Sequence, residues 1–74
     1  MADRHPATLG LLRWFDFTHL PPHLAGVSGL FSHLAHELVD VLPDGPELTT
    51  ALRKLLESKD AAVRARIEAE ERRG

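Results

Sequence analysis

Three aromatic side chains near the start of the chain are the first that could bind a ligand. Trp14, Phe15 and Phe17 lie within residues 9–17, and His19 follows them closely. Aromatic faces stack on planar rings such as nucleobases, and each stack contributes about 1–3 kcal/mol. The alternative is burial, because a short chain needs the apolar area of its aromatics to form a core.

A pair of neighbouring cations could complete such a site. Arg53 and Lys54 are adjacent, and the hydroxyls of Thr49 and Thr50 precede them. Guanidinium and ammonium groups are the side chains that most often bind phosphate, and hydroxyls add further donors. The plainer interpretation of the pair is a solvated helix face, where most lysines and arginines lie.

Histidines and carboxylates form a second group, in the middle of the chain. At 100° per residue, His33, His36, Glu37 and Asp40 share one polar arc of a helix. Such a set could bind zinc if a partner chain added a ligand. The arc lacks the His-Glu-x-x-His order of hydrolytic zinc helices. We prefer a solvated face, and we expect no metal.

No motif in the chain indicates catalysis. The serines and threonines do not occur in a nucleophile elbow, and the five glycines are too scattered to form a phosphate-binding loop. A water-shielding pocket also needs more than 74 residues. We therefore expect neither enzymatic activity nor a cofactor.

The length of the chain instead favours association with other subunits. A domain of 74 residues buries only about 60% of its unfolded surface, and its core contributes about 3–5 kcal/mol. The chain has no cysteine, so disulfides cannot add stability. We therefore expect a homo-oligomer.

The charge pattern excludes several partners. The net charge is −2, and no lysine or arginine lies between Arg13 and Arg53, so the basic stripe of a duplex-binding protein is missing. No apolar run approaches the roughly 20 residues of a membrane span. The N-terminus does not resemble a signal peptide. We expect no DNA or RNA duplex, no membrane, and a cytoplasmic protein.

Prolines divide the chain into a short arm and two long helices. Residues 1–8 are polar and predicted to be mobile, and residues 9–17 are predicted to form a helical turn or an extended arm. Pro21 or Pro22 should begin a helix ending at Leu42, and Pro46 should begin another that runs to about Arg72. The short link between them predicts an antiparallel helical hairpin. The predicted domains are an N-terminal arm, 1–20, and a hairpin, 21–74.

Apolar residues recur at spacings of three and four on both helices. On the first, a seam predicted to face the core is widened by Leu30, Ala35, Val39 and Leu42. The second helix is longer, about 40 Å against 30 Å, so Val63 and Ile67 overhang and need another subunit. The predicted seams are Leu24, Val27, Phe31, Leu34, Leu38 and Val41 on the first helix, and Leu48, Leu52, Leu55, Ala62 and Ile67 on the second.

Four motifs together resemble a known family. They are Phe-Asp-Phe-Thr-His-Leu-Pro at 15–21, the stretch 27–35, Leu-Pro-Asp-Gly-Pro-Glu at 42–47, and Ala-Leu-Arg-Lys-Leu-Leu-Glu-Ser-Lys-Asp-Ala-Ala-Val-Arg at 51–64. This pattern resembles the small phage anti-CBASS cyclic-nucleotide sponges, whose helical hairpin also occurs in phage Thoeris anti-defence sponges. The resemblance covers about residues 15–67.

The resemblance implies a function and an assembly. It implies a non-enzymatic homohexamer, built from interlocked dimers, in the cytoplasm of a host bacterium. Its pockets between protomers would sequester cyclic di- or trinucleotide messengers of bacterial immune systems.

The resemblance also implies a set of ligand-binding residues. Phe17 takes the family's aromatic position and His19 its histidine, whereas Ser32 stands where the family has a lysine that contacts phosphate. The phosphate charge would then be met by one or more of His33, Arg53, Lys54 and Arg64. The missing lysine favours one alternative, a helical oligomerisation or protein-interaction module without nucleotide binding.

Overall fold

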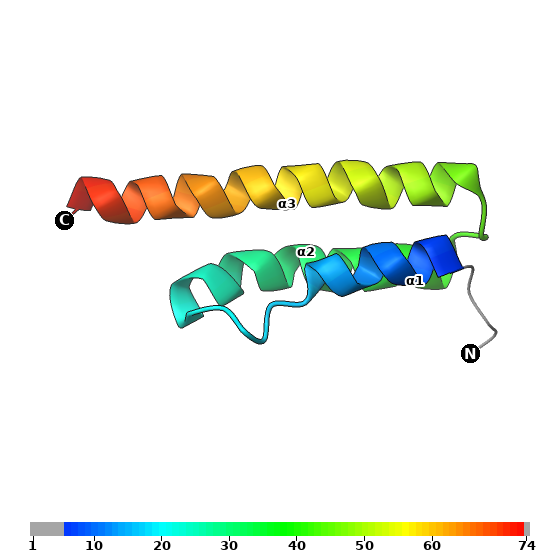
Figure 1. Ribbon diagram of the computed structural model, residues 1–74, viewed down its shortest axis with the longest axis horizontal. Coiled ribbons are helices and arrows are strands. Elements are labelled where there is room, and N and C mark those ends of the chain that lie inside the picture. The colour runs from blue at the N-terminus through cyan, green and yellow to red at the C-terminus, as the bar shows by residue number, and fades with distance from the viewer. Residues whose placement is uncertain (1–5, 74) are drawn as a thin grey trace.

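The chain is all-helical in the computed structural model, which describes residues 6–73 (Figure 1). No strand occurs in this part of the chain, so the predicted all-α class is confirmed. The expected mobility of residues 1–5 falls outside the described residues. The elements are α1 (Pro6–Leu12), the 3₁₀ turn η1 (Arg13–Phe15), α2 (Pro22–Val41) and α3 (Pro46–Arg73).

Prolines begin both long helices, as predicted. The carbonyl of Pro21 accepts hydrogen bonds from the N–H groups of Leu24 and Ala25, at 3.0 and 2.8 Å. Pro22 then occupies the first helical turn, where its missing N–H costs nothing. Leu42 is the last residue to donate into α2, and the chain becomes extended before Pro43.

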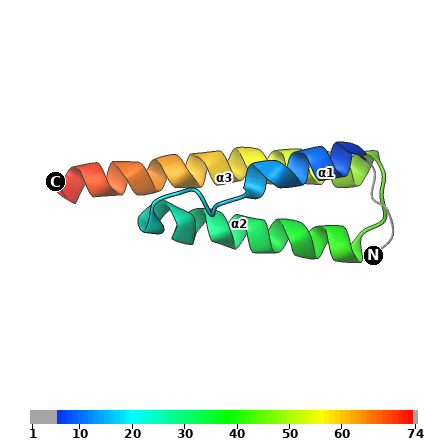
Figure 2. The ribbon, with the colours of Figure 1, turned by 60° about the horizontal axis from the view of Figure 1, so that its bottom comes forward.

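The two long helices lie side by side and run in opposite directions (Figures 1 and 2). Residues 42–45 reverse the chain, and the Gly45 carbonyl accepts bonds from both the N–H and the hydroxyl of Thr49, each at 3.2 Å. The C-terminal part of α3 extends beyond α2 (Figure 1). The molecule is therefore elongated, with extents of 46 × 20 × 17 Å.

The N-terminal segment is more ordered than predicted. Residues 6–8 were expected in the mobile start, but α1 begins at Pro6 and Thr8 is fully buried. Proline suits a first helical position, and α1 packs mainly against α3. The turn η1 then carries Phe15 into the centre of the molecule, where it has no exposed surface.

The core lies where α2, α3 and η1 meet. Its partly buried margin comprises Leu11, Leu12, Phe31, Leu55 and Leu56. The buried apolar residues are Phe15 from η1, Ala35 and Val39 from α2, and Leu48 and Leu52 from α3.

The packed face of α2 matches the predicted apolar face only in part. Ala35 and Val39, predicted to widen the seam, are buried, and Phe31 of the seam packs against the core. Leu34 and Val41 belong to that seam, yet they are 44% and 74% exposed. Small side chains let α3 and η1 approach α2 more closely than leucines would, which favours burial of the small face. The Ser28 hydroxyl has no hydrogen-bond partner among the described residues, so small size is what suits it to this position. The buried residues of α2 are Ser28, Gly29, Ser32, Ala35 and Val39.

Replacing Phe15 by alanine tests this core. The cavity should cost about 3–5 kcal/mol, which equals the whole stability expected of so small a domain. We therefore expect Phe15→Ala to lose most of its cooperative urea transition, followed by far-ultraviolet circular dichroism. The control Leu9→Ala removes an exposed side chain of α1 and should shift stability by less than about 0.5 kcal/mol. Equal midpoints for the two variants would contradict the packing of η1.

Candidate functional site

The sequence-predicted ligand residues form two groups in the fold, and three of them lie outside both. His19 and Arg64 line a cleft between the N-terminal segment and α3. Phe17 and His33 form a second group against α2. The remaining residues, Ser32, Arg53 and Lys54, belong to neither group.

Phe17 packs over the backbone of α2, on Gly29. A β-carbon added to Gly29 would lie 3.5 Å from the Phe17 ring, an ordinary van der Waals contact. The rings of Phe17 and His33 are tilted by 44°, with their centroids 6.4 Å apart. Phe17 is half-buried in this position. Its stacking capacity is therefore partly used by its own chain.

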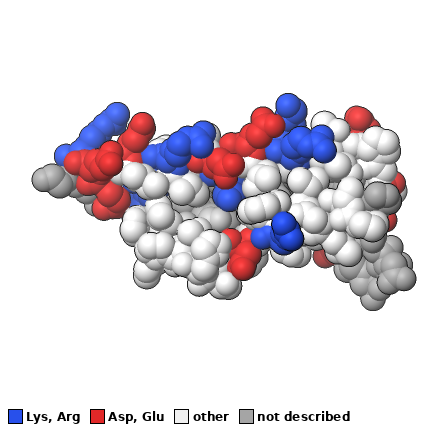
Figure 3. Space-filling view, in the orientation of Figure 1, with Lys and Arg blue, Asp and Glu red and all other residues white. Residues whose placement is uncertain are grey.

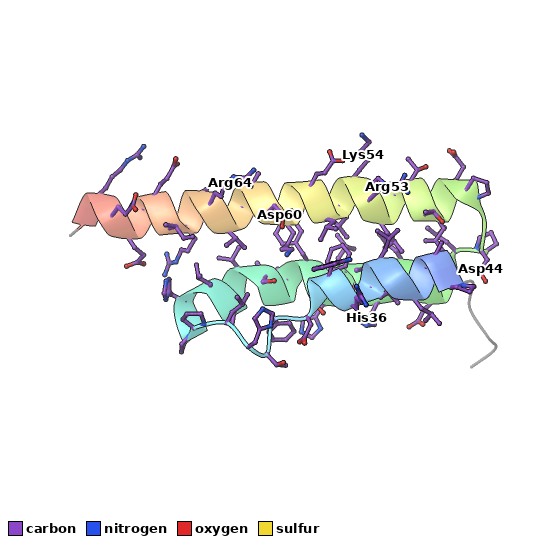
Figure 4. All side chains as sticks on the ribbon, viewed as in Figure 1. His36, Asp44, Arg53, Lys54, Asp60 and Arg64 are labelled. Carbon is purple, nitrogen blue, oxygen red and sulfur yellow. The ribbon has the colours of Figure 1, made fainter. Side chains whose placement is uncertain are left out.

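Ser32, Arg53 and Lys54 lie apart from the cleft. Ser32 is 8% exposed on the packed face of α2. Arg53 and Lys54 are exposed on α3, and Lys54 points away from α1 and α2 (Figure 4). The Lys54 ammonium lies 3.9 Å from the carboxylate of Glu57, one turn further along the helix. This cation pair matches the solvated-face interpretation.

The cleft encloses about 440 Å³ beside the second half of α3. This volume lies within the range of ligand pockets, about 300–1,000 Å³. One wall is formed by η1 and the connector that leads to α2, and the other by α3. The lining residues are Arg13, Trp14, Asp16, His19 and Leu20 on the first wall, and Lys59, Asp60, Val63 and Arg64 on the second.

Trp14 supplies an aromatic surface to this cleft. Its indole is 57% exposed, although the neighbouring Phe15 is fully buried. The guanidinium carbon of Arg13 lies 5.0 Å from the centroid of the Trp14 ring, within the range of a cation–π contact. An indole held by a cation in this way can stack a planar ligand on its accessible surface.

Basic groups outnumber carboxylates in the lining. Arg13, Lys59 and Arg64 face Asp16 and Asp60. The Lys59 ammonium lies 3.1 Å from Asp60 Oδ1, and the lysine side chain is only 15% exposed. This pairing leaves Arg64 with no carboxylate within ion-pair distance among residues 6–72. Asp60 and Arg64 are four residues apart on α3, but no ion pair joins them, and the Arg64 guanidinium remains available for an anion.

Asp16 organises the connector at the mouth of the cleft. Its Oδ1 accepts hydrogen bonds from the Thr18 N–H at 3.0 Å and from the Thr18 hydroxyl at 2.8 Å. These bonds stabilise the carboxylate and lower the pKa of Asp16 below its ordinary value, the backbone bond contributing most. The nearby His19 lowers the pKa further. The turn thus holds Asp16 ionised and sets the path of the connector past His19.

Sequence reasoning missed two members of the cleft, Arg13 and Lys59. The sequence predicts for Trp14 either ligand stacking, as one of the three aromatics, or burial in the core. Lys59 and Asp60 are one helical turn before Val63 and Arg64, so their shared face is visible from the spacing. Tertiary packing places η1 across that face, and the spacing of residues in the sequence does not reveal this position.

The described residues provide no metal centre. Among residues 6–73, no group of three or more histidine, aspartate and glutamate side chains is placed to hold a metal ion. The Nδ1 atom of His36 instead forms a hydrogen bond with the Ser32 carbonyl oxygen, at a distance of 2.8 Å. In the same part of the chain, no helix is long and apolar enough to cross a membrane.

Titration of Asp16 tests the turn at the mouth of the cleft. Because the folded state lowers the pKa of Asp16, the ionised carboxylate stabilises the fold at neutral pH. This stability is lost as the pH falls through the lowered pKa. Thr18→Val removes the hydroxyl donor, keeps the N–H, and should raise the Asp16 pKa towards its ordinary value. Carboxyl carbon NMR measures both titrations, and identical curves would contradict the observed hydrogen bonds.

The comparisons with known proteins add no relative. No protein-family model, curated protein or solved structure matches this chain. The cleft itself offers an exposed indole, three cations and a histidine around a space the size of a small ligand.

Proposed function

We propose that this chain is a non-enzymatic binding protein that sequesters cyclic oligonucleotide immune messengers, as the resemblance to phage anti-CBASS sponges implies. The cleft carries the proposal. It combines a surface on which a base can stack with cations that can meet phosphate, and the two are on facing walls. That combination is what nucleotides require of a binding site.

The base and the phosphate of a nucleotide each have a candidate partner in the cleft. The Trp14 indole is the base-stacking surface, and the Arg13 guanidinium beside it strengthens stacking. Arg64, which has no carboxylate partner among residues 6–72, and Lys59 are the phosphate ligands. His19 adds a further donor. In this proposal the cations of the cleft contact the phosphate in place of the family's lysine, at whose position this chain has Ser32.

The size of the cleft implies that it holds part of the messenger. A space of about 440 Å³ suits a single nucleotide unit. The rest of a cyclic di- or trinucleotide would extend over the edge of one protomer, towards another copy. In this proposal the α2–α3 hairpin is the building unit of a homo-oligomer, a hexamer by the resemblance, and the site is completed between protomers. Phe17 and His33 are candidates for that second half.

The mechanism is mass action. Such a sponge silences a host effector when tight sites hold the free messenger below the concentration that activates the effector. No bond is made or broken, so the chain needs a complementary, preorganised cleft and abundant copies. The packing of η1 on the core supplies that preorganisation.

Fluorescence of Trp14 tests the proposal directly, because it is the only tryptophan in the chain. Titration with 3′,3′-cyclic GMP-AMP, cyclic dinucleotides and cyclic tri-adenylate should change its emission saturably for at least one ligand. Arg64→Ala should weaken binding of that ligand about 10- to 100-fold, because it removes a hydrogen bond from a charged group. The bound ligand should be recovered intact after heat denaturation.

Arg53→Ala is the matched control, since it removes the same group from the same helix outside the cleft. It should leave the affinity unchanged. Equal losses in Arg53→Ala and Arg64→Ala would exclude the cleft as the site. A folded protein that responds to no ligand of the panel would exclude the sponge and favour the alternative, an oligomerisation or protein-interaction module. Recovery of a cleaved ligand would contradict the absence of catalysis.

A further inference from the structure

One side of α2 carries a continuous apolar strip that the rest of the described residues leaves largely uncovered. Leu30, Leu34 and Val41 are 69%, 44% and 74% exposed, and the half-buried Val27 and Leu38 complete the row. The five residues follow one another at spacings of three and four, so they form a single line along the helix. We call these five residues the α2 strip.

The α2 strip has the character of an interface. Single exposed apolar residues are common on protein surfaces, whereas contiguous rows mark interaction sites. Lysine, arginine, aspartate and glutamate gather along α3, and the surface over α1 and α2 is mostly uncharged (Figure 3). Within α2 the only charged side chains are Glu37 and Asp40. A partner for this strip must therefore be apolar itself.

The charges of α2 indicate which partner fits. Both acids lie in the C-terminal half of the helix, where the helix dipole disfavours negative charge. The first turn has no acidic residue, and Pro21 provides no side-chain cap. The positive end of α2 thus lacks an anion, and the same helix carries anions near its negative end. An inverted second copy of α2 satisfies both ends at once.

We propose that two copies of this chain pair through the α2 strip, with their α2 helices antiparallel across a two-fold axis. The proposal rests on the homo-oligomeric part of the proposed function and names its first interface. A two-fold contact matches the strip with itself, so Leu30 of each copy packs near Leu34 of the other. The leucines that the hairpin leaves exposed become the buried centre of the dimer.

The antiparallel arrangement also places opposite charges together. With Leu30 and Leu34 at the crossing, Glu37 of one copy lies within about one helical turn of His23 of the other. His23 lies four residues before Val27, on the same side of α2 as the α2 strip, so it faces the same partner. A parallel pair would instead set Glu37 beside Glu37 and align the two helix dipoles unfavourably.

Molar mass in solution tests the interface. Light scattering coupled to size exclusion should give a multiple of 8.2 kDa for the unaltered chain. Leu30→Glu combined with Leu34→Glu should raise the dissociation constant of the dimer at least about 100-fold. His36→Glu combined with Ser58→Glu adds the same two charges to exposed positions off the strip and outside the cleft, and should keep the mass unchanged. Circular dichroism checks that all variants remain helical.

Charge exchange tests the orientation. His23→Glu alone places two acids together in the antiparallel dimer and should weaken it. His23→Glu with Glu37→Lys restores an opposite pair and should recover the affinity. A parallel dimer would give no recovery, because position 23 would then face its own copy. Failure of the double variant to recover overturns the antiparallel arrangement.

The outcomes separate this interface from the proposed function. A monomeric unaltered chain, or a Leu30→Glu/Leu34→Glu variant with unchanged mass, overturns the α2 strip as an interface. Trp14 fluorescence is recorded on the same samples. A dimer that binds no cyclic nucleotide supports the interface and overturns the sponge. A monomer that binds one overturns the interface and supports the sponge.

Discussion

The close contact between the small-residue face of α2 and the leucines of α3 is the constraint on which the rest of the structure depends. Ala35 and Val39 of α2 meet Leu48 and Leu52 of α3 in the core. Interiors pack at the density of organic crystals, so two long helices approach most closely where one of them is smooth. Turning this face inward leaves the bulky α2 strip outside. The fold is therefore held by one face of α2 and leaves another exposed.

The N-terminal segment connects this core to the cleft. In η1, Phe15 enters the core while the preceding residue, Trp14, stays exposed over α3. The tight turn directs successive side chains to different sides, so burying one aromatic positions the other. A residue of the core thus anchors one wall of the cleft, and the Asp16–Thr18 turn directs the connector past it.

The two available surfaces differ in chemistry, as their proposed tasks require. The cleft beside the second half of α3 has cations around an exposed indole and suits an anionic, planar ligand. The α2 strip is apolar and has acids only towards the C-terminal end of the helix, which suits another copy of the same helix. The proposed sponge would need both, because one thin pair of helices offers little enclosed space and a second copy would add to it.

Short-range rules in the sequence determined where the two long helices begin and end. Pro22 and Pro46 begin α2 and α3 where proline sterics predict, and Pro43 follows the end of α2. The sequence also identified Arg64 and His19 as candidate ligand residues, and the structure brings them to one cleft. These features depend on residues close in the chain, whose geometry is local.

Only the tertiary structure decided which faces are buried. By periodicity, two overlapping faces of α2 are apolar enough to pack, and the leucine-rich face has the more hydrophobic side chains. The small face is buried instead, because closeness of approach to α3 and η1 depends on the shape of three elements together. For the same reason Arg13 and Lys59 line one cleft, although their residue numbers differ by 46, and Arg53 and Lys54 remain on the outer side of α3. Such contacts arise between segments far apart in the chain, and no local pattern encodes them.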